Sequence, residues 1–486
     1  MANKFSSFMK CGEEKMDTGC DFDAHCHVFD LEYLLLEMEQ MLLDGLRGRY
    51  PMRRLADTGV NGDEGGRIPV RGVVRKALIM LHFTPMLFRA ACGDETKNAE
   101  FVFAIGKKVF KKDIAIIPLM MDFYFAFGAP LPAPKQKPST LSRAFRPKRR
   151  QHSIEEVEPK FRRRMAGVIA EGGSKARKGE LHGKCSDYVA LVKRTMEAAI
   201  DFQKRDASAD PYVKTVGFEY QLRKLKELRS VYPDRTFPFF AIDPRREGIV
   251  DYIVAGNYVS KEEGPFFGCK LYPRAGYMPD VRELDPLYSY CEKIDVPVTT
   301  HCSRTGFPPA ALIWRWKLTD FGAPKNYAEV LKRHPKLRLN LAHFGGGGQD
   351  RSWSNDVTAL MAACRTGVPN ESRVFSDLSG YTAEDHSDLV RWWREFADND
   401  LVKNQTMFGS DFDVMVYTTR MTLEEYNSRF NGGARVPLPL STMMGSTVRR
   451  FLGKDKANSS ACEKHDQESA VRELVGSIDS AHDARA

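Results

Sequence analysis

The stretch LKRHPKLRLNLAHFGG (331–346) shows most directly how this chain folds. His334 and Pro335 indicate the turn from a helix into the apolar run that follows. That run is short and ends in His343, a residue that can do chemistry. A buried strand with a polar residue at its C-terminal end is typical of a parallel sheet that builds a site along one edge.

Seven other segments repeat this design, a short apolar or β-branched run that ends in a polar residue. In chain order they are DFDAHCH (21–27), DIAIIPLMMD (113–122), FPFFAID (237–243), FFGCKLY (266–272), VPVTTHC (296–302), RVFSDLS (373–379) and QTMFGSD (405–411). Apolar residues at three- and four-residue spacing predict helices between them, at Leu31–Leu46, Asp187–Lys204, Tyr212–Leu228, Asp385–Phe396 and Leu440–Leu452. Eight strands that alternate with helices predict an α/β fold, a (β/α)8 TIM barrel with its site at the C-terminal ends of the strands.

The predicted barrel spans residues 21–453, between an N-terminal segment (1–20) and a polar C-terminal tail (454–486). Long stretches follow the first and second predicted strands, and extra length after a barrel strand lies at the mouth of the site. We therefore expect large insertions there that form a lid or wall. Residues 131–186, within the second insertion, are rich in Pro, Lys, Arg and Gly, which predicts a basic and mobile segment.

The positive charge of the chain is concentrated in one segment. The net charge is +9, but residues 135–184 hold 15 Lys/Arg and 5 Asp/Glu, which leaves about −1 for the rest. A nucleic-acid-binding protein would spread its basic residues over the folded surface. Phe145 and Phe161 are the only Phe, Tyr or Trp residues of the segment, so it lacks a stacking platform for bases. We expect a small-molecule substrate and no nucleic-acid partner.

The composition indicates a soluble protein of a reducing compartment. Ten cysteines in 486 residues are too few for a disulfide scaffold, and none of them form a CxxC pair. The N-terminal sequence MANKFSSFMK lacks the apolar stretch of a signal peptide, and the apolar segment Ala115–Pro132 is interrupted by Asp122 and by prolines. We expect a cytoplasmic protein that crosses no membrane, and a homodimer stays open as its assembly.

Histidines at the strand ends suggest a metal site. His25 and His27 lie two apart on a predicted strand, so both imidazoles face the same side and can offer two nitrogen ligands. A His-x-His pair on its own is more often a pair of packed or surface histidines. Here His301, His343 and Asp411 end the fifth, sixth and eighth predicted strands, which favours a shared site.

Several of these motifs resemble the amidohydrolase superfamily in their order along the chain. They are HxH in the first strand, KLYP (270–273), VPVTTH (296–301), LNLAHFGG (339–346) and FGSDF (408–412). The resemblance is greatest to the amidohydrolase-2 type, which contains metal-dependent hydrolases and non-oxidative decarboxylases. It covers roughly residues 21–30, 113–122 and 237–453, and it implies a metal-dependent barrel enzyme.

The resemblance implies a role for each matching residue. His25, His27, His301 and Asp411 would bind one divalent ion, expected to be zinc (Zn2+), with manganese (Mn2+) or iron (Fe2+) as alternatives. Asp411 would also take a proton from the metal-activated water. His343 would either bind a second ion or polarise the substrate carbonyl.

Lys270 has two open interpretations. In one branch of the superfamily a lysine on the fourth strand is carboxylated and bridges two metal ions; otherwise Lys270 is a cation that faces the substrate. Arg274 and Arg304 follow the fourth and fifth strands, where an arginine can bind a substrate carboxylate or lie on the surface. Strand alternation predicts that the cysteines next to site residues point toward the helices as small buried groups; these are Cys26, Cys269 and Cys302.

Three functions fit these residues. The first is a metal-dependent hydrolase that acts on an amide, ester or lactone carbonyl. The second is a metal-dependent non-oxidative decarboxylase, which two or more arginines near the metal would favour. The third is a non-catalytic binding protein on a barrel scaffold, and the presence of the whole ligand set argues against it.

Overall fold

The structure is a computed structural model of the chain. It describes residues 20–28, 33, 36–37, 95–122, 124, 215–246, 248–261, 264–304, 306, 321–346, 351–381, 387–412, 414, 421–433 and 437–454. The basic insertion 131–186, the predicted helix Asp187–Lys204, the tail after Lys454 and nearly all of segment 1–20 lie outside these residues. Most of both expected insertions also lies outside them, so the lid or wall stays a prediction.

Eight short parallel strands occur at the eight predicted places, because strands buried on both faces are rich in apolar and β-branched residues. They are β1 (Asp21–Cys26), β2 (Ile114–Pro118), β3 (Phe239–Ile242), β4 (Gly268–Leu271), β5 (Val298–His301), β6 (Leu339–Ala342), β7 (Val374–Asp377) and β8 (Thr406–Met407). β1 pairs with β2, and β3 to β8 pair in chain order, each pair parallel.

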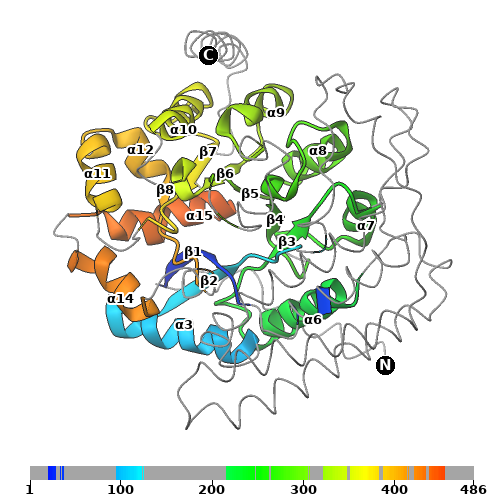
Figure 1. Cartoon of the computed structure of the whole chain (residues 1–486), viewed down its shortest axis with the longest axis horizontal. Helices are drawn as coiled ribbons and strands as arrows, with labels where there is room; N and C mark the ends of the chain where they lie inside the picture. Colours follow the sequence, from blue (N-terminus) through cyan, green and yellow to red (C-terminus); the bar gives the residue numbers. More distant parts are fainter. Residues whose placement is uncertain are drawn as a thin grey trace, which may run out of the picture.

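Hydrogen bonds join the two sheets into one ring. Met120 N donates to Phe239 O of β3 at 3.1 Å, and Leu119 forms a parallel bridge with Phe239. On the other side, Ala24 N of β1 donates to Phe408 O, just after β8, at 3.0 Å. Figure 1 looks along this ring of strands. The closed ring confirms the predicted (β/α)8 barrel.

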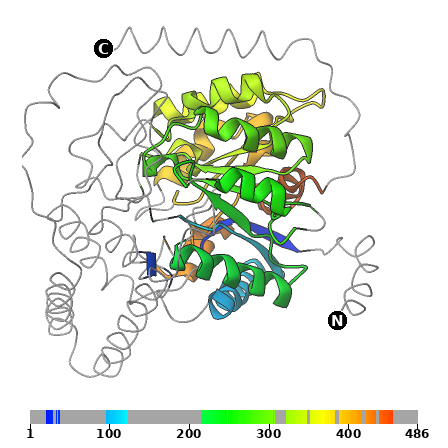
Figure 2. The same cartoon turned by 90° about the vertical axis from the view of Figure 1, so that its right-hand side faces the viewer.

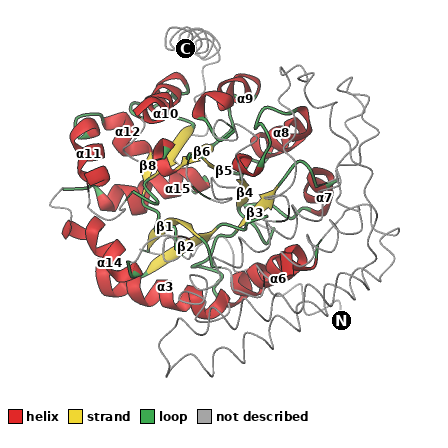
Figure 3. Ribbon diagram, in the orientation of Figure 1, coloured by secondary structure: helices red, strands yellow, loops and turns green. Residues whose placement is uncertain are grey.

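Most of the helices surround the ring and cover its outer face (Figure 1 and Figure 3). In chain order the helices are α3 (Glu95–Phe110), α6 (Val216–Val231), α7 (Ile249–Gly256), α8 (Asp285–Lys293), α9 (Ala328–Arg333), α10 (Arg351–Ala363), α11 (Ser387–Phe396), α12 (Asp400–Gln405), α14 (Leu423–Ser428) and α15 (Thr447–Leu452). Within the described part of the chain, no helix has the length and apolarity that a membrane crossing requires.

The predicted helices agree with these elements where the structure describes them. α6 and α11 confirm two of them, and the predicted helix Leu440–Leu452 is a turn of π-helix (Thr442–Ser446) followed by α15. Of the predicted helix Leu31–Leu46, the described residues 33, 36 and 37 are helical.

Apolar side chains fill the end of the ring where the strands begin. The ring centroid of Phe451 in α15 lies 5.9 Å from that of Phe239 and 5.3 Å from that of Phe375, and all three residues are buried. Phe22 and Ile117 belong to the same apolar cluster. Figure 2 shows the barrel from the side, with helices lying next to one another around the strands. Because this end is packed with apolar groups, the polar residues of the strands gather at the opposite end.

The cysteines next to the site residues are buried, as predicted. Cys26, Cys269 and Cys302 have no exposed surface. Sγ of Cys269 lies 3.8 Å from Sγ of Cys291 in α8, so this thiol points toward the helical layer. The Cys291 contact and burial raise the pKa of the Cys269 thiol, and burial raises that of Cys302, which leaves both thiols protonated and unreactive.

Candidate metal centre and active site

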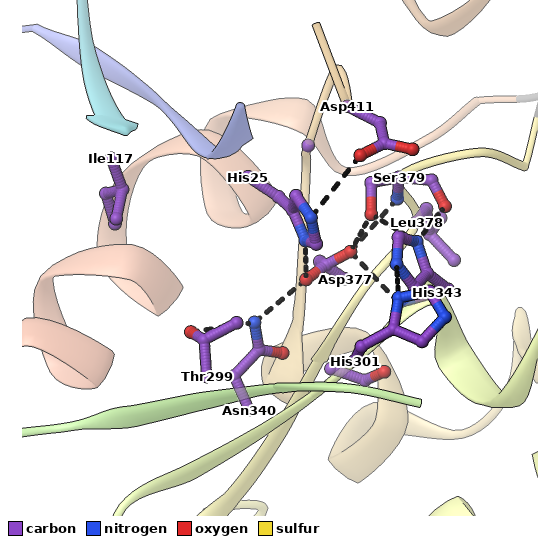
Figure 4. Close-up of polar contacts among 12 residues, drawn as sticks. His25, Ile117, Thr299, His301, Asn340, His343, Asp377, Leu378, Ser379 and Asp411 are labelled. Atoms are coloured by element: carbon purple, nitrogen blue, oxygen red, sulfur yellow. Dashed lines mark hydrogen bonds and ion pairs between the residues drawn. The ribbon is translucent and has the colours of Figure 1, made fainter. Parts of the chain in front are cut away.

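The polar residues that the sequence places at the strand ends meet inside the barrel (Figure 4). Each of these side chains belongs to a residue that is at most 8% exposed, so the group lies in a poorly solvated environment. In chain order they are His25 in β1, His27 directly after it, Lys270 in β4, His301 in β5, His343 after β6 and Asp411 after β8.

Hydrogen bonds at Nδ1 define the proton positions of His25 and His27. Nδ1 of His25 lies 3.0 Å from Oδ2 of Asp377, and Nδ1 of His27 lies 2.9 Å from the carbonyl oxygen of Leu119. An ionised carboxylate and a carbonyl oxygen can only accept, so each Nδ1 carries a proton and donates it. Nε2 of the neutral ring then carries a lone pair. Burial lowers the pKa of His27 well below its usual value, which keeps that ring neutral.

The Nε2 atoms of His25 and His27 converge on the carboxylate of Asp411. Their distances to Oδ1 of Asp411 are 3.4 Å for His25 and 3.6 Å for His27. Nε2 of His25 is buried and has no hydrogen-bond partner among the described residues. Acceptor atoms this close repel one another unless a cation lies between them. Two ligand atoms about 2.1 Å from an ion, at a tetrahedral angle, are about 3.4 Å apart, so the spacing fits a divalent ion.

His301, the fourth predicted ligand, lies beside His343. Nδ1 of His301 is 2.9 Å from Nε2 of His343. Nδ1 of His343 lies 3.1 Å from the carbonyl oxygen of Ser379, so this nitrogen carries the proton and Nε2 accepts from His301. Nε2 of His301 thus keeps a lone pair, as Nε2 of His25 and of His27 does. Among the described residues, two groups of three have ligand atoms within 4.8 Å of one another, His25 with His27 and Asp411 and His25 with His343 and Asp377, and His301 is in neither.

The backbone at two candidate catalytic residues adopts the left-handed conformation. φ is 65° at His343, 45° at Phe344 and 51° at Asp411. This conformation costs free energy for residues other than glycine. Hydrogen bonds hold both amides in place: His343 N donates to Oδ1 of Asp377 at 3.1 Å, and Asp411 N donates to His25 O at 2.8 Å. Strained backbone of this kind clusters where a side chain must be aimed at a site.

Asp377 connects these residues, and no motif marked it in advance. It accepts hydrogen bonds from His25, Asn340, His343 and Ser379. Burial acts to raise its pKa, but the interactions with His25 outweigh burial and hold the pKa well below its usual value. The position of Asp377 in the sequence could have indicated it. Asp377 lies at the C-terminal end of the seventh strand, as the predicted site residues lie at the ends of their strands.

Tyr272 is a second residue that the motifs did not assign to the site. Its ring centroid lies 4.5 Å from that of His301. A Cβ atom on Gly306 would lie 2.7 Å from the Tyr272 hydroxyl and 2.9 Å from Nε2 of His301, so the hydroxyl and this nitrogen border the same small space. The KLYP motif contains Tyr272 directly before its proline, which was the only sequence signal for it.

The three predicted substrate-binding cations differ in their surroundings. Lys270 is 2% exposed, and burial lowers its pKa to about 8 against the opposing effect of Asp377 and Asp411. Arg274 is 3% exposed. Nζ of Lys270 and two guanidinium nitrogens of Arg274 have no hydrogen-bond partner in the described part of the chain. Arg304 is exposed instead, with its guanidinium 4.9 Å from the centroid of a tryptophan ring.

Comparisons with known proteins give one family and several similar folds. A family model described as amidohydrolase matches residues 198–423, and no curated protein sequence matches the chain. A solved 5-carboxyvanillate decarboxylase from Novosphingobium aromaticivorans, with bound manganese, is 11% identical, covers 91% of this chain and 99% of its own, and has a TM-score of 0.43. A 2,6-dihydroxybenzoate decarboxylase from Rhizobium is 14% identical, covers 49% of this chain and 78% of its own, and has a TM-score of 0.33. A probable 2-pyrone-4,6-dicarboxylic acid hydrolase from Acinetobacter baumannii is 11% identical, covers 48% of this chain and 78% of its own, and has a TM-score of 0.35.

The family match contains strands β3 to β8 and with them His301, His343 and Asp411. It confirms the resemblance that the order of the motifs predicts. Over residues 198–423, this chain therefore matches the amidohydrolase family model.

Proposed function

We propose that this chain is a metal-dependent hydrolase that cleaves an amide, ester or lactone with water. His25, His27, His301 and Asp411 would hold one divalent ion. The observation that carries the proposal is the convergence of two buried Nε2 lone pairs on the Asp411 carboxylate, at 3.4 and 3.6 Å. Mixed imidazole and carboxylate ligands favour zinc, and manganese or iron also fits this ligand set.

The chain's own residues supply the proton transfers. A bound divalent ion lowers the pKa of water and polarises a carbonyl. Asp411 can accept the proton of the attacking water, because its carboxylate adjoins the Nε2 atoms of His25 and His27. Burial lowers the pKa of His343 to about 4, so its ring is neutral near pH 7, with its Nε2 accepting a hydrogen bond from His301. The Tyr272 hydroxyl borders the same space as Nε2 of His301, where a substrate oxygen would meet it.

A metal-dependent non-oxidative decarboxylase is the second candidate, and the buried cations favour it. Nζ of Lys270 and Nε and Nη1 of Arg274 are buried without a hydrogen-bond partner in the described residues. An unpaired buried cation is costly unless an anion binds beside it. A substrate carboxylate would supply that anion, and in a decarboxylase it is also the group that leaves as carbon dioxide.

Metal analysis tests the ion site that both candidates require. Protein prepared without chelator should contain about one equivalent of divalent metal, and a His25→Ala/His27→Ala double variant should contain little. Two equivalents would instead indicate that Lys270 is carboxylated and bridges two ions. Metal content that is unchanged in the double variant would rule out the proposed ligands.

Product analysis then separates the two reactions. The protein is offered a panel of lactones, esters and amides, and in parallel a panel of carboxylated aromatic acids. Hydrolysis places oxygen from isotopically labelled water in the acid product, whereas decarboxylation releases carbon dioxide and leaves no label. A metal-loaded protein that turns over neither panel would favour the third function, a binding protein. The cytoplasmic location and the homodimer stay predictions, which cell fractionation and light scattering would check.

A further inference from the structure

Asp377 accepts five hydrogen bonds, although it is not one of the proposed metal ligands (Figure 4). Oδ2 accepts from Nδ1 of His25 at 3.0 Å and from Nδ2 of Asn340 at 2.8 Å. Oδ1 accepts from the amides of His343 and Ser379, both at 3.1 Å, and from the Ser379 hydroxyl. The carboxylate has no exposed surface, so water cannot replace it as the acceptor.

We propose that Asp377 is the positioning residue of this site: it fixes the proton of His25 and the backbone of His343 at the same time. The inference rests on the proposed function, because it takes His25 as a metal ligand. Asp377 reaches the two residues through different oxygens, so it links β1 to the residue that follows β6. A carboxylate is required, because donors approach from both sides.

The contribution to His25 is chemical. Nδ1 of His25 must carry a proton to donate to Asp377, and this leaves the Nε2 lone pair directed at Oδ1 of Asp411, 3.4 Å away. Acceptors that hold the outer nitrogen of a metal-binding histidine set its tautomer and orientation. Loss of the acceptor would therefore affect metal binding even if the ring kept its place.

The contribution to His343 is conformational. The φ of 65° at His343 is unfavourable, and the hydrogen bond from its amide to Oδ1 of Asp377 is one of the contacts that hold it. The Ser379 hydroxyl donates to the same oxygen and lies 2.9 Å from Nδ1 of His343. Ring and backbone of His343 thus both depend on the Asp377 carboxylate.

Asp377→Asn offers a sharp test. The carboxylate accepts hydrogen bonds at both oxygens, whereas an amide has one oxygen that accepts and one NH2 group that donates. The amides of His343 and Ser379 cannot stop being donors, so the new side chain should turn its oxygen toward them. Its NH2 group would then face His25 and Asn340. Asn340 can rotate its amide to accept, but His25 can accept at Nδ1 only if its proton moves to Nε2. The proton on Nε2 of His25 would then occupy the position where this nitrogen would bind the ion. A histidine in the wrong tautomer impairs other active sites in the same way.

The experiment measures the His25 tautomer and the metal affinity separately. Nitrogen NMR of metal-free protein should show the Nδ1–H form of His25 in the wild type and the Nε2–H form in Asp377→Asn. Competition with a chelator should show that the variant binds zinc about 10–100-fold more weakly. Asp243→Asn is the matched control, because Asp243 is a buried carboxylate just after β3 that bonds Arg245. It should keep the wild-type tautomer and zinc affinity.

Each outcome separates this inference from the proposed function. Wild-type protein that binds no metal would overturn the proposed function. Wild-type protein that binds metal, with an Asp377→Asn variant of equal zinc affinity and unchanged His25 tautomer, would overturn only the inference. If Asp377→Asn does not fold, the NMR measurement on metal-free wild-type protein tests the inference by itself. An Nε2–H tautomer of His25 there would contradict the role given to Asp377.

Discussion

At the scale of single residues, Asp411 and His343 are the candidate catalytic groups. Asp411→Asn keeps the side-chain shape but replaces an acceptor oxygen with an NH2 group. Turnover should fall roughly a hundredfold or more, in the range for a lost acid–base group. His343→Ala should cost a comparable factor and leave most of the metal bound, because His343 is not one of the four proposed ligands. Steady-state kinetics and metal analysis measure the two effects.

The matched control for these variants is Asp251→Asn, an exposed carboxylate in α7 that should leave turnover unchanged. Full activity of both Asp411→Asn and His343→Ala would show that this pocket is not catalytic. A two-metal protein that loses half of its metal in His343→Ala would make His343 a ligand, and Lys270 would then be the carboxylated bridge.

Glu37 is a residue with a shifted pKa away from the proposed ligands. It is 1% exposed, and its carboxyl group accepts a hydrogen bond from the Thr215 hydroxyl. Burial, and then the charge of Asp122, raise its pKa from 4.5 to about 8. The protonated form is therefore favoured in the folded state. Its stabilising contribution is complete below about pH 4.5, falls as the pH rises and is lost above about pH 8.

Glu37→Gln should remove this part of the pH dependence, because glutamine resembles the protonated acid. The Glu37 carboxyl makes the free energy of unfolding of the wild type fall by up to about 1.4 kcal/mol per pH unit within that window. Urea unfolding at several pH values between about 5 and 8 should therefore give a flatter profile for the variant. Profiles that run parallel would show that Glu37 is ionised in the folded protein.

At the scale of elements, the approach of β8 to β1 places Asp411 against the histidines. A Cβ atom on Gly409 would lie 2.6 Å from Cβ of His25 and 3.1 Å from Cβ of Ser379. Gly409→Ala must therefore push the end of β8 away from β1. We expect a loss of about 1–3 kcal/mol in the free energy of unfolding, as for other overpacked sites, together with weaker metal binding.

Gly445→Ala is the control for this effect. The nearest atom to a Cβ on Gly445 is Nη1 of Arg449 at 3.8 Å, which is an ordinary contact. Thermal unfolding and zinc competition should leave Gly445→Ala close to the wild type. Equal losses of stability and zinc affinity in both variants would show that the β1–β8 distance does not control the site.

At the scale of the whole molecule, the basic charge is concentrated in residues 135–184, outside the described residues. The composition of 131–186 offers too little apolar area to offset the entropy of ordering it, which predicts a mobile cover. Limited trypsin digestion should cut first between Lys135 and Lys184 and leave the barrel strands intact, as read by mass spectrometry. Early cuts within the strands, with this segment protected, would contradict the prediction.

The sequence by itself determined the strands and the end of the barrel at which the candidate site residues lie. Each strand depends on a few consecutive residues, because a parallel strand that is buried on both faces is a short run rich in apolar and β-branched residues. The same short runs end in His25, His301, His343 and Asp411, so a reader of the sequence can place these side chains at one end of the barrel. His25 and His27 are two residues apart, so the sequence also predicts that their side chains lie on the same side of the strand.

Only the tertiary structure decided how the atoms of the site face one another. The register of β1 shifts between Asp23 and Cys26, so Phe22 packs in the apolar cluster at the start of the strands while His25 faces Asp411 and His343. Regular alternation would send these two side chains to opposite sides of the strand.

The proton positions are also a tertiary property. The acceptors at Nδ1 of His25 and His27 are Asp377 and Leu119, which are 352 and 92 residues away along the chain. Closure of the barrel brings these strands together, and no short pattern records which acceptor will meet which ring. Asp377 escaped the motifs for this reason: its importance lies in contacts with three residues from two other segments of the chain and not in the residues beside it.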